Sequence, residues 1–256
     1  MGKRSNLGNF QGRTFIFLFV MTVYLFSLPF ATNKVEGNEA STSISPFIQE
    51  FITQNAARIG KSRQLIFATN RDASSFLIEI HVLERKKGTW RLVFPSFIGT
   101  IGEKGYAPLN KKKEGDGRSP TGIYSLGTAF GYSPSVATKM AYRQTTEEDF
   151  WVDDASSEDY NRWIKGRPKS TSAERMKRED DLYKYGVVID YNVNPVIKGK
   201  GSAIFLHIWG GEGRPTVGCV AMSEEKVLRL LGWLDPAKKP LIIMGTEAEL
   251  RAKEPQ

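Results

Sequence analysis

The chain has few of the side chains that build disulfides and metal sites. Its 256 residues include one cysteine, Cys219, and two histidines, His81 and His207. One cysteine excludes an intramolecular disulfide and a cysteine-rich zinc module, and two histidines exclude a site with three histidine ligands. The sequence also lacks the His-Glu-x-x-His pattern of zinc peptidases. These absences leave a short inventory of groups for catalysis.

Positive charge is in only modest excess over negative charge. Lys and Arg number 36 against 28 Asp and Glu, a net charge of +8, and hydrophobic residues make up 40% of the chain. This composition is typical of a globular protein and not of a disordered one. Basic runs such as residues 111–113 are typical of solvated loops, and no nucleic-acid-binding motif accompanies them. We therefore expect no nucleic-acid partner.

The N-terminal segment lacks acidic side chains and then lacks charge altogether. Three basic side chains precede residues 14–33, which are uncharged and mostly apolar. A basic start, an apolar stretch and the small Ala31 near its end are typical of an export signal. We interpret residues 1–31 as a signal peptide, with a retained N-terminal anchor as the alternative. We expect the protein in the periplasm or the extracellular cell-wall space, anchored by residues 14–31 if that segment is kept.

An exported chain with one unpaired cysteine is unusual. Structural cysteines outside the cytoplasm come in pairs. Cys219 is therefore either buried and inert or kept for its reactivity, and its neighbours in the sequence decide between the two.

Hydrophobic periodicity predicts a fold that is mainly β, with a few helices. Strands are expected at residues 64–68, 76–84, 90–97, 186–191, 202–209 and 241–244, and helices at 46–58 and 223–234. Residues 127–181 show few periodicities. After the signal we expect a lead-in with a short helix at residues 32–63 and one domain at residues 64–246. A C-terminal tail at residues 247–256 is expected to follow.

His81 lies in the expected strand 76–84. The apolar residues of this strand alternate, at positions Phe76, Ile78, Ile80 and Val82. A period of two predicts that one face of the strand is buried. His81 belongs to the other face, and we interpret it as a partly exposed strand residue without a catalytic role.

One stretch, residues 204–222, brings the single thiol close to a histidine. An expected strand carries His207, a loop rich in glycine and proline follows, and Cys219 lies just before a helix. A thiol with a pKa of about 8.5 is mostly protonated at neutral pH, so attack on an acyl carbon needs a base within reach. If the loop makes a hairpin-like return, Cys219 is the nucleophile and His207 its base.

Two residues beside the cysteine are candidates for supporting roles. Gly218 has no Cβ, so it either lets a substrate carbonyl approach the backbone closely or permits a positive φ. The amide N–H groups of Gly218, Cys219 and Val220 are candidates for an oxyanion hole. Thr216 is expected to hold the loop or to contact the substrate.

These residues resemble a known family. His207, a loop and then Thr-Val-Gly-Cys at residues 216–219 look like the signature of the L,D-transpeptidase catalytic domain, in which a His and a variable loop precede Ser/Thr-x-Gly-Cys. The sequence Asp-Gly-Arg-Ser-Pro-Thr-Gly-Ile-Tyr at 116–124 resembles the family's Pro-Thr-Gly segment before a strand. The resemblance covers roughly residues 64–245. Further similarity to a bacterial subgroup lies at residues 151–154, 160–161 and 201–207.

The resemblance implies a fold, a reaction and partners. The implied fold is a β-sandwich-like domain of mixed sheets with the cysteine in a cleft, and no cofactor takes part. Cys219 attacks the amide after the third residue of a peptidoglycan stem peptide and releases the terminal D-amino acid. The thioester then passes to an amine of a neighbouring stem, forming a 3→3 cross-link, with His207 as base and then as proton donor.

Two further properties follow from the resemblance. The expected partners are peptidoglycan stem peptides, as donor and as amine acceptor, with no membrane partner beyond the possible anchor. Carbapenems are expected to acylate Cys219. A backbone carbonyl often orients the histidine in this family.

The sequence departs from the family pattern at three places. Many members have His before the Gly-Cys pair and Asn or Arg two residues after the cysteine, where this chain has Val217 and Ala221. The loop between His207 and Thr216 is shorter than in many members. The nucleophile is unaffected, but donor and acceptor recognition must use other groups.

Three other functions remain open. With water as acceptor the same site is an L,D-carboxypeptidase, which the sequence cannot separate from a transpeptidase. A glycosidase needs two carboxylates across a cleft, and the adjacent acids at 153–154 and 180–181 are more typical of solvated turns. A non-catalytic wall-binding module would stack sugars on tryptophans, the candidates being Trp90, Trp151, Trp163 and Trp209.

Overall fold

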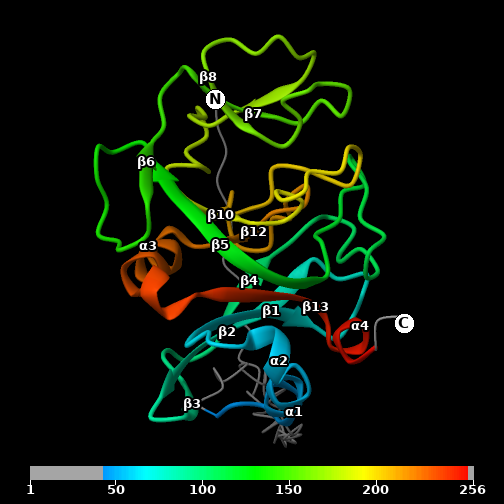
Figure 1. Cartoon of the computed structure of the whole chain (residues 1–256), viewed down its shortest axis with the longest axis vertical. Coiled ribbons are helices and arrows are strands. Elements are labelled where there is room, and N and C mark those ends of the chain that lie inside the picture. The colour runs from blue at the N-terminus through cyan, green and yellow to red at the C-terminus, as the bar shows by residue number, and fades with distance from the viewer. Residues whose placement is uncertain (1–42, 253–256) are drawn as a thin grey trace, which may run out of the picture. The chain divides into compact units, whose positions relative to one another are not determined.

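The apolar strands pair into a sheet that closes on itself (Figure 1). The structure is a computed structural model that describes residues 43–252, so the expected signal segment lies outside the described residues. In hydrogen-bonded order, the closed path runs through β1 (Gln64–Asn70), β13 (Leu241–Thr246), β5 (Gly122–Gly131), β10 (Tyr185–Ile189), β11 (Phe205–Ile208), β12 (Val220–Met222), β4 (Phe97–Thr100) and β2 (Leu77–Lys86), and β2 pairs again with β1.

Short elements complete the fold. β3 (Thr89–Leu92) forms a hairpin with β2, and β6 (Tyr142–Gln144) pairs with β5. A separate three-stranded sheet has the order β8 (Trp163–Lys165), β7 (Asp149–Val152), β9 (Ala173–Arg175). The helices are α1 (Pro46–Gln54), α2 (Ala56–Ile59), α3 (Glu224–Trp233) and α4 (Glu247–Arg251), with a 3-10 turn at Pro236–Lys238. The expected mainly β fold with a few helices is confirmed. None of the helices in residues 43–252 has the length and apolar character of a membrane span.

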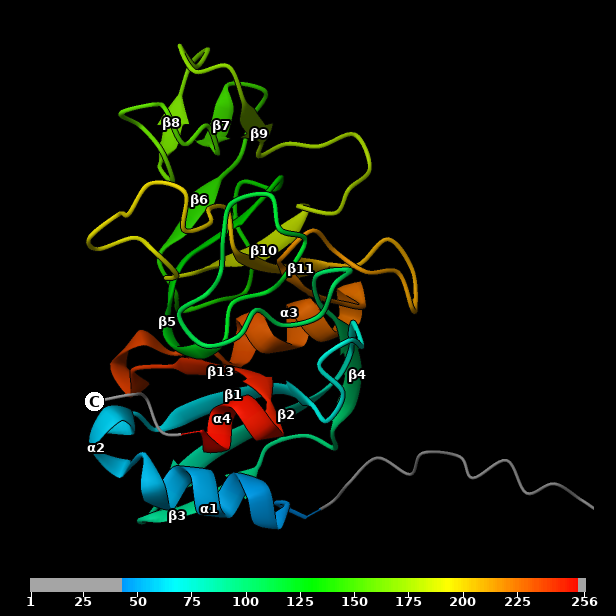
Figure 2. The same cartoon turned by 90° about the vertical axis from the view of Figure 1, so that its right-hand side faces the viewer.

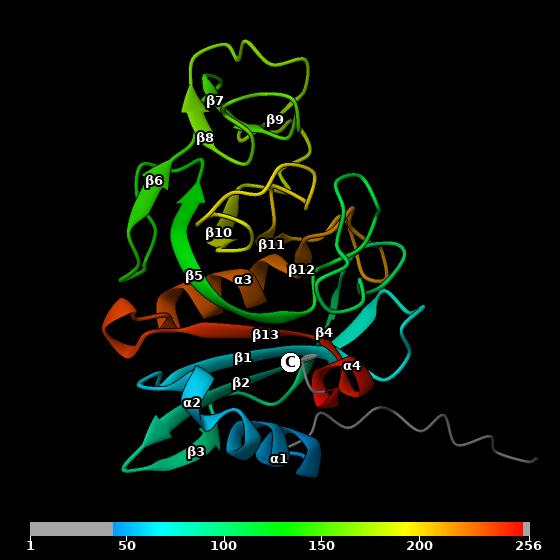
Figure 3. The same ribbon diagram turned by 45° about the vertical axis from the view of Figure 1, so that its right-hand side comes forward.

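The interior of the closed sheet holds the largest apolar core. Alternate strand residues point into it, because successive side chains of a strand project to opposite faces. Helix α3, which follows Ser223 as predicted, adds Val227, Leu230 and Leu231 to this core. Figure 3 shows α3 between the β10–β11 part of the sheet and the β13–β1 part.

The outer face of β1, β2 and β13 is covered as well. Helix α1 packs Phe47, Ile48 and Phe51 against strand residues such as Phe67 and Leu83. This covering corrects the prediction for His81, which is only 5% exposed. The alternation along β2 predicts one buried face, but the second face is covered too.

A third, aromatic cluster joins the closed sheet to the three-stranded sheet. Phe205 of β11 lies at its centre, with ring contacts to Phe130, Trp151 and Tyr183. Cys219 belongs to the same cluster. In Figure 2 the strands β7, β8 and β9 stand beyond β10 and β11.

Several expected boundaries differ from the observed ones. The expected strand 90–97 is two strands, β3 and β4, separated by a bend. The expected helix 46–58 is interrupted at Asn55, where α1 ends and α2 begins. The expected tail contains the short helix α4. The sequence pattern does not predict β7, β8 and β9, because strands of three or four residues are too short to show a period.

Candidate active site

The two strands that carry the predicted dyad are parallel neighbours. Leu206 of β11 pairs with Val220 of β12, and His207 pairs with Ala221. The expected hairpin-like return is therefore wrong, since the segment 209–219 crosses over and re-enters the sheet in the same direction. Cys219 immediately precedes β12, and the alternation of side chains places it on the same face as His207.

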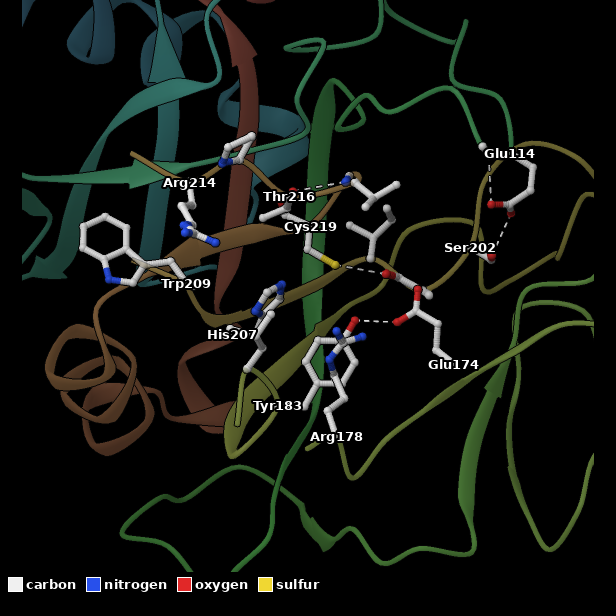
Figure 4. A pocket seen from close by; sticks show the side chains of 18 of the residues that line it. Glu114, Glu174, Arg178, Tyr183, Ser202, His207, Trp209, Arg214, Thr216 and Cys219 are labelled. Carbon is white, nitrogen blue, oxygen red and sulfur yellow. Dashed lines mark hydrogen bonds between the residues drawn. The ribbon is translucent and has the colours of Figure 1, made fainter. Parts of the chain in front are cut away.

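All four residues predicted from the sequence line one cavity. It has a volume of about 210 Å³, and Thr216, Gly218, Cys219 and His207 lie along it (Figure 4). Trp209, Arg214 and Val217 of the same segment also line it. Other lining side chains come from earlier parts of the chain, namely Lys112, Glu114, Glu174, Arg178, Leu182, Tyr183 and Ser202.

The thiol of Cys219 is held by backbone groups. Its Sγ donates to the carbonyl oxygen of Ala203 at 3.1 Å and accepts from the N–H of Phe205 at 3.3 Å. Burial raises the pKa of Cys219 to about 12, and the nearby carboxylate of Glu174 acts in the same direction. The resting sulfur is therefore a neutral thiol.

His207 is a neutral imidazole with a defined tautomer. Its Nδ1 lies 2.7 Å from the carbonyl oxygen of Ile208, which can only accept, so Nδ1 carries the proton and Nε2 has the free lone pair. Burial lowers the pKa of His207 to about 4. The ring of Tyr183 packs edge-on against the imidazole, with centroids 5.0 Å apart. The Ile208 carbonyl is the orienting group that sequence reasoning could not locate.

The resting thiol and imidazole are not bonded to each other. Among the hydrogen bonds of the described residues, none joins Cys219 to His207, since each is bonded to a carbonyl instead. In an unliganded site such bonds are often formed only with the substrate in place. For proton transfer, the thiol must give up its hydrogen bond to the Ala203 carbonyl and form one to His207.

Thr216 holds the turn that presents the cysteine. Its Oγ1 donates to the carbonyl oxygen of Cys219 at 2.7 Å and accepts from the N–H of Gly218 at 3.1 Å. Of the two roles expected for Thr216, the structure shows the first, holding the loop. The Gly218 N–H is thereby engaged within the turn.

Gly218 packs closely against a second loop. Its φ lies outside the left-handed region, but a Cβ at this position would lie 3.0 Å from the carbonyl oxygen of Arg118. Ser119 in the same loop is fully buried, and its Oγ donates to the carbonyl oxygen of Gly218 at 2.6 Å. Sequence reasoning missed Ser119 as a supporting residue, although it lies in the segment 116–124 that carried the resemblance.

The positions that depart from the family pattern have different environments. Val217 is 77% exposed at the rim of the cavity, where it can meet a ligand. Ala221 is fully buried in β12, between β11 and Thr100 of β4. A ligand therefore cannot contact Ala221 through its side chain.

Three of the side chains considered for other functions, Asp154, Asp180 and Trp151, have structural partners. Asp154 accepts hydrogen bonds from Ser156 and Thr171, and Asp180 is bonded to Arg178. The indole of Trp151 is buried and donates to Asn161, so it offers no surface for stacking sugars. Within residues 43–252, no three or more His, Cys, Asp or Glu side chains are grouped as a metal site.

One family model matches more than half of the chain. The model of the YkuD family, the L,D-transpeptidase catalytic domain, matches residues 78–243. The chain belongs to this family. The crystal structure of the helical cell shape determining protein Pgp2 from Campylobacter jejuni is similar, with a TM-score of 0.38 and 15% identity. That match covers 77% of this chain and 54% of the other, so the chain spans about half the length of its structural relative. No curated protein sequence matches the chain.

Proposed function

We propose that this protein is an L,D-transpeptidase that acts on peptidoglycan stem peptides through a thioester on Cys219 and forms 3→3 cross-links. One observation carries the proposal. In a chain of the L,D-transpeptidase catalytic domain family, the single thiol, just before β12, and a neutral imidazole on the neighbouring strand β11 line one cavity.

Acylation starts from a neutral pair. As the donor amide enters the cavity, the thiol leaves the Ala203 carbonyl and gives its proton to Nε2 of His207. The sulfur attacks the amide carbon, and the imidazolium then protonates the departing D-amino acid. Nδ1 stays bonded to Ile208, which keeps the ring oriented during both transfers.

The oxyanion of this step needs a donor beside the sulfur. The N–H of Gly218 is engaged by Thr216, and Val220 lies within the ladder of β11 and β12. We assign the donor role to the amide of Cys219 itself. An amide in this position is already oriented before the charge develops, which is the basis of oxyanion stabilisation.

Location outside the cytoplasm is part of the proposal. The uncharged run at residues 14–33 and the unpaired Cys219 support it. Cell fractionation of the full chain is the test, and recovery of the protein with cytosolic markers would contradict it.

The proposal is tested by following the acyl-enzyme and its products. Incubation of the full chain with a carbapenem, or with a stem tetrapeptide, should add one acyl group, which peptide mapping places on Cys219. The variant Cys219→Ala should form no adduct and no product. Tripeptide with no cross-linked dimer would show an L,D-carboxypeptidase, and turnover by Cys219→Ala would contradict cysteine catalysis.

A further inference from the structure

A second pair of titratable side chains lies beside the Cys219 sulfur. Tyr183, just before β10, donates its hydroxyl to Oε2 of Glu174 in β9 at 2.5 Å. Both side chains line the cavity of Cys219 and His207. Figure 4 shows Glu174 and Tyr183 pointing toward each other, with His207 on the opposite side of the sulfur from Glu174. The acylation step described above uses neither of them.

The cavity contains a second carboxylate, that of Glu114, and its hydrogen bonds differ from those of Glu174. Both oxygens of Glu114 are engaged, since its Oε2 accepts from Tyr160 at 2.5 Å and from Ser202 at 2.6 Å, and its Oε1 accepts from the N–H of Gly115 at 3.2 Å. Glu174 has only the bond from Tyr183. Among the described residues, no hydrogen bond uses its Oε1. Glu174 is therefore the cavity acid with an oxygen left for a ligand.

The cations near Glu174 do not neutralise it. Arg178 makes two hydrogen bonds to Asp180, at 2.8 and 2.5 Å, and its guanidinium lies over the ring of Tyr183 at 5.1 Å. Burial raises the pKa of Glu174, and the charges of Asp153 and Glu114 act in the same direction. The hydrogen bond from Tyr183 and the charge of Arg178 lower it. A half-buried carboxylate without an ion-pair partner favours a cation or a proton beside it.

We infer that Glu174 binds the ammonium group of the acceptor and takes its proton before the amine attacks the thioester. This inference rests on the proposed function and adds to it the group that recognises the second substrate. The ligand class is a primary amine that is protonated in water. Tyr183 is a positioning residue, because its hydroxyl fixes Oε2 and leaves Oε1 toward the cavity.

The transfer step balances in protons. The ammonium gives one proton to the carboxylate of Glu174, and the neutral amine then attacks the thioester carbon. The C–N bond forms, the C–S bond breaks, and His207 takes the second proton from nitrogen. The thiolate of Cys219 regains a proton from the imidazolium, and the acid form of Glu174 releases its proton to solvent. The transfer step therefore releases one proton, and the amine of the departing D-amino acid takes one up after acylation.

The test compares two nucleophiles that differ in their need for a base. The stem tetrapeptide serves as donor and as ammonium acceptor, and hydroxylamine serves as an acceptor that is already neutral at pH 7. In Glu174→Gln the amide oxygen still accepts from Tyr183, but the charge is gone. We expect the ratio of dimer to tripeptide to fall by about 10²-fold, the usual size of a general-base effect. The ratio of hydroxamate to tripeptide should fall far less.

The matched control is Glu179→Gln, which removes an exposed carboxylate in the same segment. It should keep both wild-type ratios. If both product ratios fall equally in Glu174→Gln, or if neither falls, the inference is overturned. Acylation of Cys219 would still uphold the proposed function in that case. A wild-type protein that acylates but never makes dimer also overturns the inference, and absence of acylation overturns both.

A measurement on the wild-type protein avoids any folding defect of the variant. With Glu174 as base, the dimer ratio should level off with rising pH once the carboxylate is ionised. An acceptor that must deprotonate in solution would instead raise the ratio by about tenfold per pH unit up to its own pKa. A continued rise of that size would contradict the role of Glu174.

Discussion

The two histidines of this chain lie in two regions that are equally buried and chemically different. His81 on β2 and His207 on β11 are each 5% exposed, and burial lowers the pKa of both. His81 lies 3.5 Å from a carboxylate oxygen of Glu79, its Nδ1 has no hydrogen-bond partner among the described residues, and it does not line the cavity of Cys219. His207 has its Nδ1 on the Ile208 carbonyl and opens to a cavity that contains a thiol. A neutral buried imidazole is thus common to both regions, and only the neighbouring thiol and the cavity distinguish the candidate base.

The largest expected difference between the two regions is in acylation rate. His207→Gln should slow formation of the Cys219 adduct by about 10²–10⁴-fold, because the base for the thiol proton is lost. His81→Gln should leave the rate as in the wild-type protein, since His81 lies on another part of the sheet. The rate constant is measured by mass spectrometry of the adduct over time.

The acylation rates of the two variants distinguish a catalytic role of His207 from a general effect of burying a histidine. An unchanged rate in His207→Gln would remove His207 from the mechanism. If both variants slow acylation equally, the loss of any buried histidine disturbs the site through overall folding. The position of His207 beside the thiol would then not explain the effect. Circular dichroism of each variant separates these cases from a loss of structure.

The same comparison shows what the sequence can predict. The strand at 76–84 follows from alternation along one segment, but the burial of His81 depends on α1 and α4, which no local pattern places over β2. Cys219 and His207 were recognisable together because a strand, a glycine-rich loop and a thiol lie close in sequence. Their parallel arrangement depends on the hydrogen bonding of the whole sheet.

Glu174 illustrates the part that the sequence does not predict. It belongs to β9, a strand of three residues inside the segment 127–181 that shows few periodicities. Its place beside the thiol results from the aromatic cluster that joins two sheets. Charge and spacing along the chain contain no signal for such a contact.

The two regions should resemble each other in how stability depends on pH. Each histidine has a lower pKa folded than unfolded, where the value is 6.5, so the unfolded chain takes up protons first as the pH falls. The contribution of His207 is fully present above pH 6.5 and is lost progressively down to about pH 4. It amounts to at most about 3 kcal/mol.

Urea unfolding at a series of pH values checks this prediction. Between pH 7 and pH 4 the free energy of unfolding should fall less in His207→Gln than in wild type. His81→Gln should also reduce the dependence, because that site is shielded as well. If neither variant changes the slope, the two imidazoles titrate normally and their burial does not hold them neutral.

The smallest expected effect comes from two threonines, one in each region. Thr216 bridges Gly218 and Cys219, and Thr246, at the end of β13, accepts from the N–H of Glu249 as the N-cap of α4. Replacing either by valine should cost about 1 kcal/mol, since each change removes local side-chain hydrogen bonds of similar kind. Only Thr216→Val should also slow acylation, because it alone loosens the turn that presents the sulfur, and Thr216→Ser should restore the rate. Urea unfolding and adduct kinetics on the same samples make the comparison. Equal acylation rates in the two valine variants would show that the Cys219 turn is held by its packing on Arg118 and Ser119 and not by Thr216.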